Sequence, residues 1–219
     1  MRITKAAYVA SLEKLKGYPG WGRPEIALAG RSNVGKSSLI NNLTNNGHLA
    51  RTYSEPGKTR MINIYSVNEE FFLADLPGYG FAKASGTERR RWQGMIEGFL
   101  EGSEKLVHTL LLVDVRHEPT EEDRQMADYL RSIGLPFSVV ATKADKLSKA
   151  QVSKNLPVIC RKLVVQPWQV TVYSSETGQG RDKLISLLDG VLHPAKEEDS
   201  GIVVPENVSF EDGPVKEEE

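Results

Sequence analysis

A glycine-rich stretch near the N-terminus has the residue types and the spacing that hold phosphate groups. Residues 30–37 read Gly-Arg-Ser-Asn-Val-Gly-Lys-Ser, between an apolar run at 26–29 and apolar residues at helical spacing in 38–43. In this strand–loop–helix order, the N–H groups of the loop and the N-terminus of the helix point at an anion. Lys36 adds a positive charge, and the Ser37 hydroxyl is a ligand that magnesium accepts. The predicted phosphate-binding residues are Gly30, Arg31, Ser32, Asn33, Val34, Gly35, Lys36 and Ser37.

A second motif follows the apolar run at 71–74. Its first residue, Asp75, would stand at the end of a buried strand, where a carboxylate suits the surroundings of a magnesium ion. Gly78 can offer its backbone N–H to the γ-phosphate when the loop closes. The predicted members of this motif are Asp75, Leu76, Pro77 and Gly78.

A third motif follows the apolar run at 137–141 and could recognise a base. The Asp145 carboxylate can accept hydrogen bonds from N1–H and the 2-amino group of guanine. Adenine lacks this pair of donors and would leave the carboxylate buried and unpaired, which enforces the choice of base. The stem of Lys143 can lie over the base plane. The predicted members of this motif are Thr142, Lys143, Ala144 and Asp145.

The order of these motifs excludes an ordinary glycine turn at 30–37. Each follows an apolar run, and a last polar group, Ser174, Ser175 and Glu176, follows another. In open α/β sheets the carboxyl ends of the strands meet at one crevice, where ligands bind. The order resembles that of small GTPases and predicts binding of GTP and GDP. An ATP-using kinase is disfavoured because Asp145 reads guanine.

A loop rich in helix- and strand-breaking residues, 51–59, precedes the strand predicted at 61–67. Its Thr59 hydroxyl could join Ser37 as a magnesium ligand, so that the segment becomes ordered with GTP and is released after hydrolysis. A plain surface turn is the alternative. The residues of this loop predicted to contact the nucleotide are Gly57, Lys58 and Thr59.

The sequence contains no certain catalytic base. Tyr79 stands where many GTPases place a glutamine that orients the attacking water, so intrinsic hydrolysis should be slow. Lys36, Thr59 and Gly78 are expected to stabilise the transferred phosphate. Asn33 has two interpretations, as a ligand for a potassium ion that assists hydrolysis or as a hydrogen-bonding residue of the loop, and the sequence does not choose between them.

Alternating apolar runs and amphipathic segments predict an α/β fold with a mixed, mostly parallel sheet of about six strands and helices on both faces. Two strands separated only by 68–70 must form one antiparallel hairpin. The predicted strands are 25–29, 61–67, 71–75, 108–114, 136–142 and 168–173. The predicted helices are 36–45, 88–100, 121–133, 150–164 and 180–191.

Composition and charge predict three regions and a cytoplasmic location. In a chain of 219 residues, no apolar run reaches the ~20 residues of a membrane span, and the single cysteine, Cys160, fits a reducing compartment. Residues 195–219 carry nine acids and two lysines, which predicts a disordered acidic tail. Without that tail the chain has 26 basic and 20 acidic residues, a net charge of +6. We therefore expect an N-terminal extension (1–24) packing on a nucleotide-binding domain (25–194), and a polyanionic partner.

The motifs together resemble the EngB (YihA/YsxC) family of bacterial ribosome-biogenesis GTPases, within the TrmE-Era-EngA-EngB-septin-like P-loop GTPases. The residues that carry the resemblance are 30–38, 56–59, 75–80, 114–117 and 142–146. The resemblance implies a magnesium-dependent GTP-binding protein, which we expect to be a monomer. It also implies a role in assembly of the large ribosomal subunit and in cell division and septation. The acidic tail departs from the family pattern, as does Ser175, which stands where many GTPases have alanine.

A basic cluster at Arg89, Arg90 and Arg91, next to Trp92, could meet RNA phosphates and stack on a base. Ion pairing within a helix and burial of the tryptophan are the alternative. A GTP-regulated switch whose main target is a protein rather than ribosomal RNA also fits the sequence, and the salt dependence of binding would distinguish the two.

Overall fold

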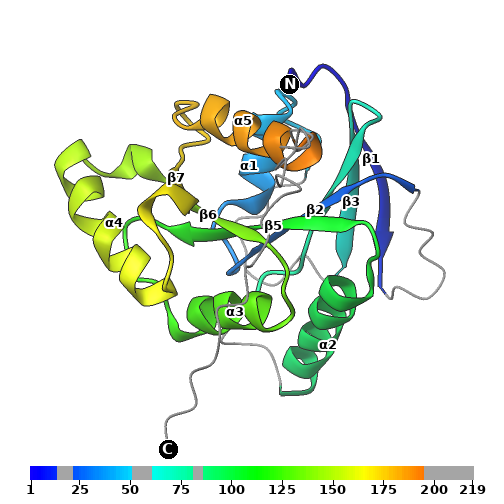
Figure 1. Ribbon diagram of the computed structural model, residues 1–219, viewed down its shortest axis with the longest axis horizontal. Helices are drawn as coiled ribbons and strands as arrows, with labels where there is room; N and C mark the ends of the chain where they lie inside the picture. Colours follow the sequence, from blue (N-terminus) through cyan, green and yellow to red (C-terminus); the bar gives the residue numbers. More distant parts are fainter. Residues whose placement is uncertain (14–21, 51–60, 81–85, 195–219) are drawn as a thin grey trace, which may run out of the picture.

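A twisted sheet of seven strands forms the centre of the part of the chain that the structure describes (Figure 1). The computed structural model describes residues 1–13, 22–50, 61–80 and 86–194, with the side chains of residues 86, 88, 89 and 92 left undescribed. The strands lie in the order β1-β3-β4-β2-β5-β6-β7. Their bounds are β1 Ala6–Leu12, β2 Glu25–Gly30, β3 Ile62–Val67, β4 Phe71–Asp75, β5 Leu106–Asp114, β6 Phe137–Thr142 and β7 Val170–Val172.

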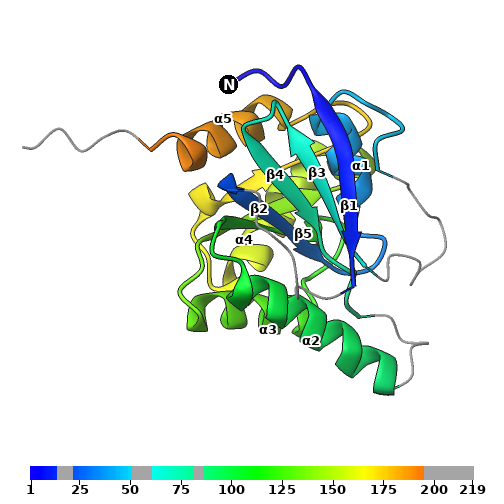
Figure 2. The same ribbon diagram turned by 90° about the vertical axis from the view of Figure 1, so that its right-hand side faces the viewer.

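Among the described residues, five α-helices cover the two faces of this sheet, as the alternating pattern predicted. Figure 2 shows α2 and α3 on one side of the sheet and α1 and α5 on the other. The helices span α1 Lys36–Leu43, α2 Gly86–Gly102, α3 Glu121–Ser132, α4 Lys149–Leu163 and α5 Arg181–Leu192. None of the helices in the described part of the chain is both long and apolar enough to cross a bilayer.

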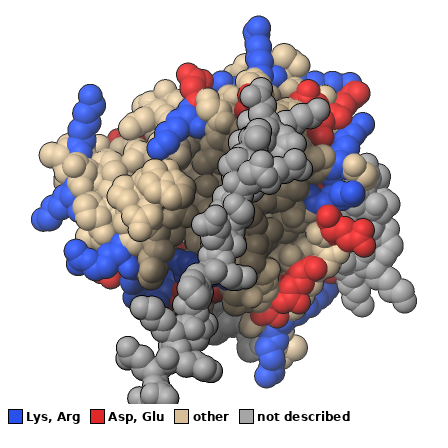
Figure 3. Space-filling model, viewed as in Figure 1, with Lys and Arg blue, Asp and Glu red and all other residues tan. Residues whose placement is uncertain are grey.

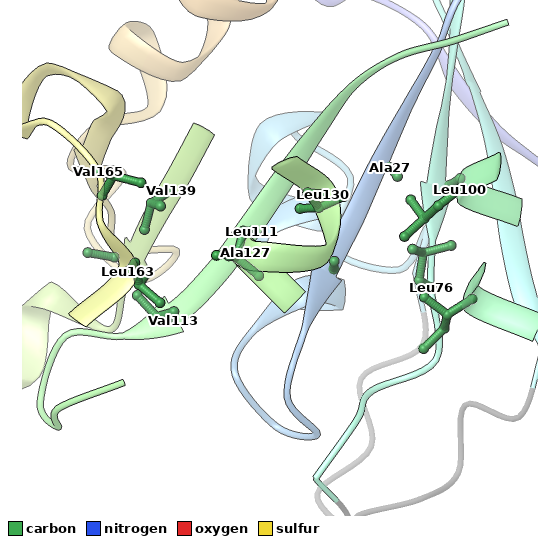
Figure 4. Packing of buried hydrophobic residues seen from close by; sticks show 14 of the residues in the cluster. Ala27, Leu76, Leu100, Leu111, Val113, Ala127, Leu130, Val139, Leu163 and Val165 are labelled. Carbon is green, nitrogen blue, oxygen red and sulfur yellow. The ribbon is translucent and has the colours of Figure 1, made fainter. Parts of the chain in front are cut away.

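Strand β2 contributes to both hydrophobic cores. Ile26 and Leu28 pack with α1 and α5, whereas Ala27 and Ala29 face the core that α2, α3 and α4 complete (Figure 4). All four side chains are at most 1% exposed. Burial on both faces explains why the sequence shows a continuous apolar run rather than an alternating one.

The predicted hairpin is confirmed, and it carries an additional strand that the sequence prediction missed. β3 and β4 pair antiparallel, and β1 pairs antiparallel with β3, so the sheet has seven strands rather than about six. β1 is an edge strand whose Tyr8 and Val9 are exposed, and it therefore lacks the apolar alternation of a half-buried strand. The Asn68 side chain accepts from Thr4 N (2.9 Å) and donates to Arg2 O (2.8 Å), which joins the N-terminal segment to the hairpin turn.

The remaining strands run parallel, and their pairing brings the predicted motifs to one edge of the sheet. β2 pairs parallel with β4 and β5, β5 with β6, and β6 with β7. In this register Gly30 lies opposite Leu112, and Asp114 lies opposite Thr142. The segment predicted as strand 168–173 shortens to β7, because a 3₁₀ turn occupies Pro167–Gln169.

A buried polar pair lies near the opposite end of β5. His108 is 7% exposed, and its Nε2 lies 3.0 Å from Ser138 Oγ on β6. Burial lowers the pKa of His108 from 6.5 to about 4. The unfolded chain therefore binds more protons than the folded chain between these two pH values, and folding stability must fall as the pH drops through them.

We predict that His108→Gln reduces the acid sensitivity of folding. A shift of this size corresponds to about 3 kcal/mol of unfolding free energy, present above about pH 6.5 and lost towards pH 4. Urea unfolding at pH 7.5 and at pH 4.5 would show a smaller difference for this variant than for the wild type. Exposed His48 offers the matched control, His48→Gln. If wild type and His108→Gln lost the same free energy of unfolding between pH 7.5 and pH 4.5, the lowered pKa would not belong to His108.

Candidate functional site

The phosphate loop starts at the end of β2, which lies between β4 and β5. A Cβ on Gly30 would lie 2.8 Å from the Leu112 carbonyl oxygen and 2.9 Å from Val34 Cγ1, so no side chain fits there. Gly35 has φ 112°, a conformation that residues with a side chain rarely adopt, and α1 begins directly after it at Lys36. Glycine is thus required at position 30 because β5 lies too close for a side chain, and at position 35 because of the backbone conformation.

Two buried charges lie beneath this loop. Lys36 (8% exposed) curls back over it, with Nζ 3.3 Å from Gly30 O and 3.4 Å from Arg31 O. Burial lowers the pKa of Lys36, and the attraction of Asp75 opposes that shift. Burial raises the pKa of Asp75, which Lys36 and a hydrogen bond from Ser37 Oγ (3.3 Å to Oδ2) oppose. The predicted Lys36, Ser37 and Asp75 are therefore brought together.

Asp75 has one oxygen that remains unsatisfied among the described residues. Its side chain is 2% exposed, and Oδ1 accepts no hydrogen bond from them. A buried carboxylate oxygen of this kind is costly unless it meets a cation or a hydrogen-bond donor. The arrangement can therefore receive a hydrated cation next to the Ser37 hydroxyl.

The Asp-x-x-Gly turn lies directly against the phosphate loop. A Cβ on Gly78 would come within 2.8 Å of Ser32 Cα, and Ser32 N donates to Tyr79 O at 3.0 Å. Leu76 N donates to Leu28 O at 3.1 Å, which extends the pairing of β4 with β2. Only glycine can bring its backbone this close to the loop, which explains the requirement at position 78.

The side chain of Tyr79 is fastened to α3 by a hydrogen bond. Its hydroxyl donates to Asp123 Oδ1 at 2.9 Å, while Asp123 Oδ2 accepts from Thr120 N at the same distance and caps α3. Burial, followed by the proximity of Asp123, raises the pKa of Tyr79 well above its usual value. The phenol thus donates a hydrogen bond within the protein.

The Thr-Lys-Ala-Asp motif is joined to the phosphate loop by hydrogen bonds. Thr142 Oγ1 donates to Val34 O (2.7 Å), and Lys143 Nζ donates to Asn33 O (2.8 Å). Lys143 Nζ also lies 3.0 Å from Asp114 Oδ2. These bonds span more than 100 residues of sequence and fix the distance between the phosphate loop and Asp145.

Asp145 is oriented by the last predicted motif. Ser174, which is completely buried, donates from Oγ to Asp145 Oδ1 at 2.7 Å, and Lys146 Nζ lies 2.9 Å from Oδ2. These two partners, Ser174 first, lower the pKa of Asp145. Ser174 Oγ also accepts from the backbone N of Glu176 and of Thr177, both at 3.2 Å. Asp145 is consequently an ionised acceptor at neutral pH.

Sequence reasoning missed a residue that joins α1 to this last loop. Asn42 Nδ2 donates to Ser175 O (3.0 Å), and Asn42 Oδ1 accepts from the hydroxyl of buried Tyr173 (2.6 Å). Arg181 reinforces the junction, since its guanidinium donates to Asn42 O (2.9 Å) and to Leu43 O (2.8 Å). An asparagine in the last turn of a short predicted helix carries no sequence signal of such a role.

Asp114 was predicted only as part of the family resemblance, and the structure gives it a defined place. Its carboxylate accepts two hydrogen bonds from the Arg116 guanidinium, at 2.9 and 2.7 Å. Burial would raise its pKa, but Arg116 and Lys143 outweigh that effect and hold the pKa at about 2. Asp114 thereby anchors Lys143 beside the phosphate loop. The predicted Gly57, Lys58 and Thr59 lie outside the described residues.

The chain is similar to curated GTP-binding proteins over most of its length. It is 47% identical over 191 residues to the probable GTP-binding protein EngB of Desulfitobacterium hafniense (strain DSM 10664 / DCB-2), covering 87% of this chain and 95% of that protein. It is 47% identical over 184 residues to the probable EngB of Bacillus subtilis (strain 168), covering 84% and 94%. A crystal structure of a probable GTP-binding protein EngB matches with a TM-score of 0.64 and 25% identity, over 77% of this chain and 98% of that one.

A protein family described as "50S ribosome-binding GTPase" matches residues 25–143. The phosphate loop, the Asp-x-x-Gly turn and the base-reading motif at the carboxyl edge of a mixed sheet define a P-loop GTPase. Within that class, the relatives establish the family: the chain belongs to the EngB GTP-binding proteins. The family resemblance carried by the sequence motifs is thereby confirmed.

The bond between Tyr79 and Asp123 can be tested through stability. We predict that Tyr79→Phe lowers the free energy of unfolding by about 2 kcal/mol, because it removes a partly buried hydrogen bond to a charged acceptor. Tyr8→Phe is the matched control, since the Tyr8 hydroxyl bonds Ser11 at an exposed site and should contribute little. Urea unfolding of both variants makes the comparison. Similar values for the two would show that the Tyr79 hydroxyl does not fasten this turn to α3.

Proposed function

We propose that the residues gathered at the carboxyl edge of the sheet bind GTP and GDP and select guanine. The observation that carries this proposal is the orientation of Asp145 by Ser174, together with the bonds that fix the base-reading motif to the phosphate loop. In this assignment residues 30–37, Lys36 among them, hold the phosphates. The turn at 75–78 contacts the γ-phosphate, and residues 174–176 complete the pocket for the base. Residues 57–59 belong to the same proposal through their sequence alone.

Magnesium fits the residues beneath the loop. Ser37 supplies a hydroxyl, and Asp75 supplies a buried carboxylate with an unsatisfied oxygen that can accept a hydrogen bond from metal-bound water. We assign Ser37 and Thr59 as the protein ligands, with phosphate oxygens and water as the others. The ion would neutralise charge on the phosphates. For Asn33, potassium coordination and loop hydrogen bonding remain the two interpretations.

Hydrolysis is expected to be slow without assistance. Tyr79 occupies the position of the water-orienting residue, and its hydroxyl is already used by Asp123. Lys36, Thr59 and Gly78 then stabilise charge on the transferred phosphate but do not activate water. This assignment supports a switch that waits for a partner or a cation rather than an enzyme of high turnover.

We predict that Asp145→Asn changes the choice of base. An amide can no longer accept two hydrogen bonds from guanine, but it can donate to the 2-oxo group of xanthine. GTP affinity should fall more than about 30-fold, the equivalent of about 2 kcal/mol, while xanthosine triphosphate becomes the better ligand. Calorimetric titration with both nucleotides measures this. Asp128→Asn on exposed α3 is the control and should bind GTP as the wild type does. A variant that keeps the wild-type preference for GTP would disprove the role of Asp145.

The proposed cellular role is GTP-dependent assembly of the large ribosomal subunit in the cytoplasm, with a requirement for normal cell division and septation. The name of the family that matches residues 25–143 and the net charge of +6 outside the acidic tail support it. We assign the chain as a monomer, with the 1–24 extension packing on a nucleotide-binding domain (25–194) and a disordered acidic tail (195–219).

The basic cluster on α2 receives limited support from the structure. Arg91 forms an ion pair with Glu13, and Arg90 is exposed. The side chains of Arg89 and Trp92 lie outside the described part of the molecule. The cluster stays a prediction, and its contribution is measurable in the same experiment as the ribosomal role.

Co-sedimentation with large ribosomal subunits tests this role. We predict association with a non-hydrolysable GTP analogue but not with GDP, weakening steeply as salt rises. Removal of residues 195–219 should leave association intact or slightly stronger, because the tail repels RNA. Joint replacement of Arg89, Arg90 and Arg91 by alanine should flatten the salt dependence by up to about three phosphate contacts. No wild-type association, or association insensitive to salt, would favour a protein target instead.

A further inference from the structure

Helix α4 and the turn after it present a positively charged surface on the opposite side of the molecule from β1. Residues 146–175 contain five lysines or arginines and no Asp or Glu. Lys154 and Arg161 are both exposed, and their spacing of seven residues places them on the same side of α4. Neither side chain has an ion-pair partner among the described residues. Lys162 differs, since its Nζ lies 3.3 Å from Glu121 on α3.

Apolar groups lie beside Arg161. A hollow of about 620 Å³ separates the exposed side of α4 from the segment that follows it, and Pro157, Arg161 and Val164 are among its lining residues. Trp168 comes directly after Pro167, another residue of that lining, and its side chain is 75% exposed. We refer to Lys154, Pro157, Arg161, Val164 and Trp168 as the α4 face.

The backbone at the end of α4 has an energetically unfavourable conformation at one residue, Val164. Val164 ends α4 with φ 53° and ψ 50°, where glycine or asparagine is usual, and its side chain is 65% exposed. Arg131 from α3 donates to the carbonyl oxygens of Leu163 and Val164 and fixes the end of the helix. Strained backbone conformations of this kind cluster at functional sites, which makes the end of α4 a candidate for one.

Basic side chains outnumber acidic ones on this side of the molecule, where Glu121 of α3 pairs with Lys162. Figure 3 shows Lys and Arg side chains in blue around an uncharged area at the left, over α4, whereas the larger red areas lie on the other side of the view. A surface that carries exposed cations and an exposed aromatic ring matches a ligand that combines negative charge with flat apolar groups. Single-stranded RNA has this combination, in its phosphates and in its unpaired bases.

We propose that the α4 face binds single-stranded ribosomal RNA, with a base stacked on Trp168 and phosphates against Lys154 and Arg161. The inference rests on the proposed ribosomal function and assigns it a surface away from the nucleotide motifs. An apolar protein surface is a poorer match because it would bury both cations without partners. An acidic peptide would satisfy the cations but leave the indole without a stacking partner.

Binding of RNA alone tests the surface. The probe is a labelled oligoadenylate of about 12 nucleotides, measured by fluorescence anisotropy with the full chain. Trp168→Ala should weaken binding about ten-fold, because stacking on an aromatic ring contributes this order of free energy per base. Lys154→Ala with Arg161→Ala should reduce the slope of log K against log salt by about 1.4, the value for two phosphates of a single strand.

Matched variants separate this surface from general charge and exposure. Tyr8→Ala removes an exposed aromatic ring from β1, and Lys5→Ala with Lys105→Ala removes two exposed cations elsewhere. Both should bind the oligonucleotide as the wild type does. Val164→Gly should keep or raise the urea midpoint, because it removes the left-handed strain, while it weakens RNA binding. Equal affinity of Trp168→Ala and Tyr8→Ala for the oligonucleotide would overturn the proposal. So would a second outcome, in which the same concentration of inorganic polyphosphate displaces the oligonucleotide from the wild type and from Trp168→Ala.

Co-sedimentation with large subunits distinguishes failure of this surface from failure of the proposed function. If the wild type does not sediment with subunits in the GTP-analogue state, the ribosomal function itself fails. If the wild type sediments and Trp168→Ala with Arg161→Ala sediments equally well, the function stands and the α4 face is wrong. Loss confined to the Arg89, Arg90 and Arg91 variant would place the RNA contact on α2. Loss in the α4-face variant, with GTP affinity unchanged, is the expected result.

Discussion

The pairing of β2 on both sides is the constraint on which the site depends. β2 is hydrogen-bonded to β4 and β5 and buried on both faces, so the phosphate loop starts from a fixed point. The close approach of Gly30 to Leu112 and of Gly78 to Ser32 leaves no room for a side chain at either glycine. Glycine is needed at these positions because the backbones of the phosphate loop, of β5 and of the turn after β4 approach one another closely here. The same approach places Asp75 beside the phosphate loop.

The same packing buries charge that the described residues only partly satisfy. Lys36 turns back onto carbonyl oxygens, and Asp75 keeps one oxygen without a partner. Burying such groups lowers stability, and a negatively charged ligand with its cation would supply the missing interactions. The site is therefore less stable without a ligand than a fully satisfied core would be, as is common for binding sites.

In the proposed function, switching and partner recognition fall on different parts of the molecule. Tyr79 joins the turn after β4 to the cap of α3, so a movement of this turn towards a γ-phosphate would be felt at Asp123. Arg131, near the other end of α3, holds the carbonyl oxygens at the end of α4. α3 thus lies between the nucleotide motifs and the α4 face, and gives the proposed RNA surface a physical connection to the nucleotide site.

The sequence by itself determined the hairpin, the helices of the described part of the chain, and the positions of the glycine loop and of Asp145 just after strands, because each depends on local spacing and on the period of apolar residues. It missed β1, since an exposed edge strand has no such period. The contacts of Asn42 with Ser175, of Tyr79 with Asp123 and of Lys143 with Asp114 were likewise beyond it. Only the tertiary structure decided these, because hydrogen bonds between residues far apart in the chain follow from strand order and register, which leave no trace in local sequence.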